Sequence, residues 1–145
     1  MGIKVTIKSN MPKNVSSAKK EFNNSVNRYL DRVGTYFKGK IQLHIQASPP
    51  TGRTYTHDSE GEKRAKPHIA SSKGNPPRID TGSLFNSVQY IRTKDLEGEV
   101  SVATRKNYAE TLEMELDRPF MGQKSMAYKN TLKFGKARAK EIGIK

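Results

Sequence analysis

The chain has 145 residues, enough for one domain with a single hydrophobic core. It carries 27 Lys and Arg against 14 Asp and Glu, a formal net charge of +13, and only 33% of its residues are hydrophobic. It has no cysteine, which excludes a disulfide scaffold, a thiol nucleophile and a cysteine-ligated zinc or iron–sulfur site.

The strongly basic composition predicts affinity for polyanions, either nucleic acid or an acidic protein surface. No run of about 18 apolar residues occurs, so we expect no membrane-spanning helix and no membrane partner. The first ten residues alternate apolar and polar side chains and lack the apolar stretch of a signal peptide. We therefore expect a protein of the cytoplasm, or of a particle assembled there.

The N-terminal part of the chain predicts one strand followed by one long helix. Ile3, Val5 and Ile7 alternate with polar residues, which is the period of a strand with one solvated face. Apolar residues then recur every three or four positions from Phe22 to Ile41, so they form one stripe along a helix. We expect the sheet of the protein to pack on this helix.

The segment 47–80 is rich in proline and glycine and contains few large apolar residues. Such a segment does not bury enough surface to order itself. We therefore predict a long extended loop within one domain of residues 1–145. Fully extended, the loop would span on the order of 100 Å, enough to touch a neighbouring subunit.

The second half of the chain becomes regular again. In chain order we expect a helical turn capped by Asp80 or Thr81 and ending at Ser87, a hairpin of strands Val88–Thr93 and Glu99–Ala103, a short acidic helix Tyr108–Leu116, and a last helix Gly122–Lys140. In this interpretation Gly82 permits a tight backbone, Leu84 anchors the turn, Tyr108 packs the acidic helix down, and Pro119 and Phe120 direct the chain into the last helix.

The charge is divided into three blocks. Residues 79–117 contain eight acidic and four basic residues, whereas 1–46 and 118–145 each have a net charge of +7. The last helix carries a basic stripe, and the acidic helix carries a cluster of carboxylates. Either the blocks neutralise one another within the fold, or they join one copy to the next. The candidate charges between subunits are Glu110, Glu115, Lys129, Lys133 and Lys136.

The sequence shows little sign of catalytic chemistry. The three histidines do not form a metal-ligand spacing, and neither a nucleophile elbow nor a glycine-rich phosphate loop is present. Glu110 and Glu113 lie three apart and so share a helix face, which would suit a metal-dependent nuclease. The simpler interpretation is a solvated acidic face or a docking surface. We predict no enzyme, no cofactor and no metal site.

Three blocks of the second half occur in a recognisable order. They are Pro76–Val88 with its Thr81-Gly82-Ser83-Leu84 turn and Ser87, then Tyr108-Ala109-Glu110-Thr111-Leu112-Glu113, then Arg118-Pro119-Phe120-Met121 before the last helix. This order resembles the tail-completion, or head–tail joining, proteins of long-tailed bacteriophages. The family-motif residues are Thr81, Gly82, Leu84, Ser87, Tyr108, Ala109, Glu113, Pro119 and Phe120.

The resemblance implies an α+β fold, with a small, mostly antiparallel sheet packed on the long N-terminal helix. It also implies a virion structural protein of the neck. Such a protein completes or caps the tail tube as a ring, commonly of six copies, with a central passage for DNA. Its partners would be the tail tube protein and the connector or stopper proteins of the head. It would contact the passing DNA without sequence specificity. The alternative from the residues alone is a small basic protein that binds nucleic acid without sequence preference.

Overall fold

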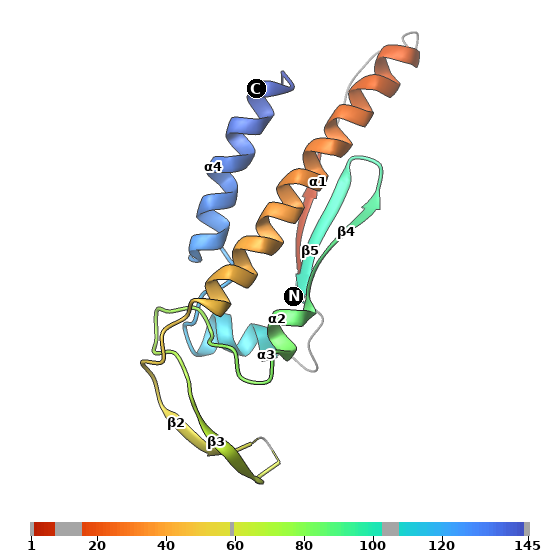
Figure 1. Ribbon diagram of the computed structural model, residues 1–145. Helices are drawn as coiled ribbons and strands as arrows, with labels where there is room; N and C mark the ends of the chain where they lie inside the picture. The colour runs from red at the N-terminus through yellow and green to blue at the C-terminus, as the bar shows by residue number, and fades with distance from the viewer. Residues whose placement is uncertain (1, 8–15, 59, 103–107, 144–145) are drawn as a thin grey trace.

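The structure, a computed structural model, describes residues 2–7, 16–58, 60–102 and 108–143. It has the predicted α+β architecture (Figure 1). The long helix α1, Ser16–Gln46, lies between a small antiparallel sheet and the C-terminal helix α4, Met126–Glu141. The predicted end of the second hairpin strand, Ala103, lies outside the described residues.

Helix α1 follows the apolar stripe read from the sequence. Its buried positions are spaced by three or four residues: Val26, Leu30, Gly34, Phe37, Ile41 and Ile45. The side chains Val26 and Ile41 are completely buried. Helix α4 covers a further part of α1, where Tyr36 stacks on Phe134 with ring centroids 4.1 Å apart.

The main sheet has three antiparallel strands in the order β1-β5-β4. These are β1 (Gly2–Thr6), β4 (Val88–Lys94) and β5 (Glu97–Val102). The first strand and the presence of the hairpin are confirmed, but its second strand begins at Glu97, two residues before the predicted Glu99. Ile3 pairs with Val100, and Tyr90 pairs with Val100 from the other side. Strand β1 therefore forms one edge of the sheet, far in sequence from its partner.

One glycine of α1 has a packing role that the sequence does not reveal. A Cβ on Gly34 would stand 2.3 Å from two ring carbons of Tyr90. The missing side chain lets the helix and β4 approach closely, and the Tyr90 hydroxyl donates a hydrogen bond of 3.0 Å to Asp31 on the same helix. Gly39 of the same helix has no such role, since nothing lies within 4 Å of a Cβ there.

The segment 47–80 is not structureless, which corrects the sequence prediction. It contains a two-stranded hairpin, the arm, formed by β2 (Thr54–His57) and β3 (Lys63–Ile69). In Figure 1 the arm projects from the end of the molecule where α1 finishes. Its strands are exposed or only half-buried on both faces, so they show no alternation of apolar and polar residues to identify them.

The chain also makes three short helical segments, one directly before β4 and two between β5 and α4. These are α2 (Ser83–Ser87), α3 (Tyr108–Glu110) and the π-helical η1 (Thr111–Glu115). The predicted acidic helix thus changes its hydrogen-bond pattern after one turn. Helix α4 begins at Met126, where the Ser125 side chain accepts a hydrogen bond from the Tyr128 N–H at 3.1 Å.

Candidate functional site

The three sequence blocks meet in one place, which we call the motif corner: residues 81–88, 108–113 and 118–122. Leu84, Ala109, Leu112 and Phe120 belong to the same buried cluster. Phe120 is completely inaccessible to solvent, and Leu112 is nearly so. Segments on either side of the β4–β5 hairpin are therefore held together by a shared core at the end of α1 (Figure 1).

Glu113 is the polar centre of this corner. Its carboxylate accepts hydrogen bonds from the backbone N–H groups of Phe120, Met121 and Gly122, at 3.0, 3.1 and 2.8 Å. The glutamate is buried. Gly122 makes room for it, because a Cβ there would stand 2.6 Å from Oε1. The expectation that Glu113 belongs to a solvated or docking face together with Glu110 is therefore wrong.

The physical reason is the π-helical turn. Residues on an α-helix three apart share a face, but the wider turn at Thr111–Glu115 breaks that relation. Glu113 turns inward, where three orphan N–H groups at the step into the last helix need an acceptor. The carboxylate is committed to those donors, and this removes it from the proposed nuclease pair.

The turn at Thr81-Gly82 differs from the sequence prediction in detail. Gly82, with φ of 84°, occupies the N-cap position directly before α2, and no side chain caps the helix. The Thr81 hydroxyl accepts a long hydrogen bond, 3.4 Å, from the Ser83 N–H, and it shares a second hydrogen bond of 2.9 Å with the Ser83 hydroxyl. Ser87 closes the same turn by donating to the Leu84 carbonyl at 2.8 Å. The left-handed backbone conformation at the N-cap explains why a glycine occupies this position. Thr81 precedes the N-cap residue and is not itself the predicted cap.

Two further motif residues, Pro119 and Tyr108, differ in how well they match their predicted roles. Pro119 is half-buried and precedes Phe120, which anchors the step into the last helix as predicted. Tyr108, expected to pack the acidic helix down, has 51% of its surface exposed. Its side chain instead lines an open cavity of about 1080 Å³ between the motif corner and the arm, together with Arg64 and Asp80.

The arm is held by polar contacts to the segment 78–80, which leads directly into the motif corner. Arg64 of β3 forms a two-pronged ion pair with Asp80, with Nη2 to Oδ2 at 2.8 Å. Arg78 donates to the Ile69 carbonyl at 3.0 Å. His68 lies 3.6 Å from the same Asp80 carboxylate, and partial burial lowers the pKa of its imidazole despite that neighbour. Sequence reasoning missed this pairing, because the two residues are sixteen apart across a proline-rich segment.

The candidate charges between subunits lie on the surface as expected. Glu110 and Glu115 are exposed on α3 and η1, and Lys129, Lys133 and Lys136 are exposed on α4. A further carboxylate of this region, Asp117, instead lies within 4 Å of the ammonium groups of Lys73 and Lys124 of its own chain.

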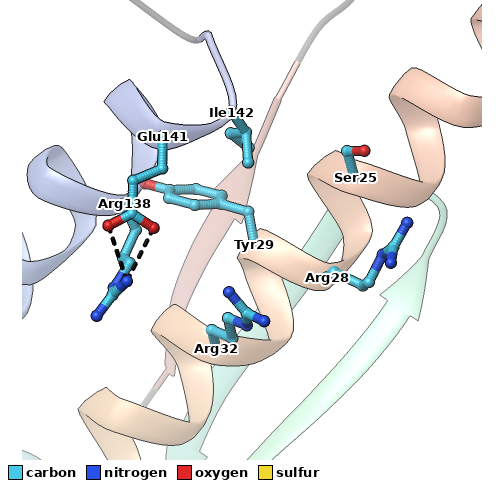
Figure 2. Close-up of a pocket in the computed structure, with 7 residues that line it drawn as sticks. All are labelled: Ser25, Arg28, Tyr29, Arg32, Arg138, Glu141 and Ile142. Carbon is cyan, nitrogen blue, oxygen red and sulfur yellow. Dashed lines mark hydrogen bonds and ion pairs between the residues drawn. The ribbon is translucent and has the colours of Figure 1, made fainter.

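A small basic crevice lies between α1 and the end of α4. It has a volume of about 220 Å³ and is lined by Arg28, Arg32 and Arg138, among others (Figure 2). Arg138 is bound to both carboxylate oxygens of Glu141 at 2.8 Å. Figure 2 shows the three guanidinium groups directed to different sides and not toward one point. The crevice thus adds positive charge to the surface without forming a converging phosphate site.

Within the part of the chain that the structure describes, no group of three or more histidine, aspartate or glutamate side chains is placed to hold a metal ion. None of the described helices combines the length and the apolar character needed to cross a bilayer. Comparisons with protein-family models, with curated proteins and with solved structures find no match to this chain.

Proposed function

We propose that the protein is a virion structural component of the head–tail junction of a long-tailed bacteriophage. Several copies would form a ring that completes the tail tube and joins it to the head connector, with DNA passing through the centre. In this proposal the residues of the chain form binding surfaces for other proteins and carry out no catalysis. Assembly in the host cytoplasm follows from the role.

The observation that carries the proposal is the motif corner. Residues of all three blocks that resemble the tail-completion proteins share one core, and the buried Glu113 carboxylate of the second block binds the backbone of the third. A resemblance due to chance composition gives no reason for the matched positions to be each other's neighbours. Leu84, Ala109, Glu113 and Phe120 are explained together as one framework that holds the acidic surface and the arm in place.

A second function is favoured by one observation. The stripe Lys129, Lys133, Lys136 and Lys140 is exposed along α4, and the chain carries a net charge of +13. Lysines without stacking aromatics support sequence-independent contact with phosphates, with a steep dependence on salt. The alternative is therefore a small basic nucleic-acid-binding protein, which would bind duplex DNA at physiological salt without any protein partner.

The test of the first proposal is removal of the coding sequence from the phage or prophage genome that carries it, followed by electron microscopy of the lysate. We expect DNA-filled heads and unattached tails, and restoration of whole particles when the protein is supplied from a plasmid. Normal virions in the deletion lysate would contradict the proposal.

A further inference from the structure

An open apolar groove lies between α4 and the edge strand β1. Its volume is about 700 Å³, and the face of α1 from Tyr29 to Phe37 forms its floor. Ile3 and Val5 line it from the β1 side and Leu132 from the α4 side. Val5 and Leu132 are 41% and 46% exposed, so apolar walls face solvent in the single chain. An apolar surface of this kind marks an interaction site.

Lysines stand at the rim of the groove. Lys136 and Lys140 lie one helical turn apart on α4, and both are exposed. Lys4 lies on the β1 side, but its ammonium group is ion-paired with Glu97. The positive charge at the rim therefore comes mainly from α4. An occupant with apolar side chains flanked by carboxylates would match both the walls and the rim.

One exposed part of this chain has that composition. We call it the knob: Glu110 at the end of α3, Met114 and Glu115 at the end of η1, and Leu116 directly after it. Met114 is 76% exposed and Leu116 is 46% exposed, and both glutamates face solvent. Glu113, between them, points inward to its three backbone donors and takes no part.

The tip of the arm is the other acidic candidate, and it fits less well. From Asp58 to Glu62 it has three acidic residues but no large apolar side chain to fill the groove. The Asp58 carboxylate also accepts hydrogen bonds from the N–H groups of Glu60 and Glu62, both at 2.9 Å, so part of its charge is used within the turn. The knob offers both the apolar and the acidic part.

We propose that the groove of one copy receives the knob of a second copy, with Met114 and Leu116 against the apolar walls and Glu115 near Lys136. The inference rests on the proposed ring and names the surfaces that would build it. No residue of the knob lines the groove, and α3 and the upper part of α4 lie at different places on the molecule (Figure 1). The contact is therefore head-to-tail, which leaves a free groove and a free knob for further copies until a ring closes.

The chain has no cysteine, so cross-linking can be directed to the two surfaces. The double variant Met114→Cys with Leu132→Cys, treated with a short thiol-specific cross-linker, should give a ladder of covalent oligomers, and each single variant should give none. The matched control is Met114→Cys with Leu43→Cys, because Leu43 is 49% exposed but does not line the groove. An absence of the ladder, or an equal ladder in the control, would overturn the assignment.

A second variant separates the groove from the function. Leu132→Arg places a charge on an exposed position, so the fold should persist by circular dichroism, and self-association should weaken by about tenfold or more. Leu43→Arg should leave association unchanged. Unchanged association in Leu132→Arg would overturn the groove contact even if deletion of the gene prevents virion assembly. If Leu132→Arg loses self-association but the phage lacking the gene still forms normal virions, the groove contact is supported and the proposed function is contradicted.

Discussion

The buried carboxylate of Glu113 accepts a hydrogen bond of 3.0 Å from the backbone N–H of Phe120, seven residues later in the chain. The same oxygen accepts from Met121, and the other oxygen accepts from Gly122. A single side chain thus fixes the end of η1 to the segment that leads into α4. Its role is structural, and it determines where the exposed acidic residues on either side are presented.

Glu113→Gln should lower the free energy of unfolding by about 1 to 3 kcal/mol, because the amide places an N–H₂ group against backbone donors. Glu113→Ala should cost about 3 kcal/mol or more, since three buried N–H groups lose their acceptor. Denaturant unfolding measures both. The exposed neighbour Glu115→Gln should change stability by less than about 0.5 kcal/mol. Equal effects at the two positions would contradict the assigned role.

Two glycines of α1 should respond in opposite directions to alanine. Gly39→Ala should stabilise the protein by up to about 1 kcal/mol, because the added Cβ meets nothing within 4 Å and alanine is the better helix former. Gly34→Ala should destabilise it by about 1 to 3 kcal/mol, because the Tyr90 ring would have to move. The melting temperatures of the two variants, compared with that of the parent chain, test both predictions. A stabilised Gly34→Ala protein would show that α1 and β4 are less closely packed than described.

Alkaline pH should weaken the fold through Tyr90. Partial burial, together with the hydrogen bond to Asp31, raises the pKa of its phenol from 10.0 to about 12. Between these values the unfolded chain loses the proton while the folded chain keeps it, so the free energy of unfolding falls as the pH rises. Below pH 10 this group contributes no pH dependence. Burial also raises the pKa of Tyr29 and of Tyr108, so ultraviolet titration of tyrosinate should show one fewer late-ionising group in Tyr90→Phe than in the parent chain. An unchanged number of late-ionising groups would be contrary to the assignment.

Charge reversal should separate the assembly surfaces from the folding core. Glu110→Lys with Glu115→Lys should abolish self-association while the monomer stays folded, because both side chains are exposed. Glu113 is excluded from this reversal because its charge is used inside the molecule. Adding Lys136→Glu should restore part of the association. Analytical ultracentrifugation across a salt series measures the effect, and rings that survive the reversal would show that electrostatic contact is not what joins the copies.

The elements with one buried face could be predicted from the sequence. The stripe of α1 and the β4–β5 hairpin each present a regular apolar period, because each buries one side against the core. The arm has no buried face, so its strands carry no period, and Pro67 within β3 argued against a strand. Its contacts with the rest of the chain, such as those from Arg64 to Asp80 and from Arg78 to the Ile69 carbonyl, show why it is ordered.

The candidate site was predictable in its residues but not in their roles. Leu84, Ala109 and Phe120 could be placed in the core because they are apolar or small within the motif blocks. Glu113 could not be placed there, because a glutamate among other acidic residues is expected to be solvated. Its burial becomes evident only from the N–H groups that donate to its carboxylate. Those partners are backbone N–H groups seven to nine residues away, and no side-chain pattern records them.

The solution mass of the purified protein tests the central claim most directly. Light scattering should be measured at physiological salt, with and without a short DNA duplex, over a wide range of protein concentration. The account predicts a particle of several chains that is independent of DNA, near six times the 16.3 kDa chain, or about 98 kDa. A single chain at every concentration, which gains mass only when DNA is added, would contradict the ring and favour the nucleic-acid-binding alternative.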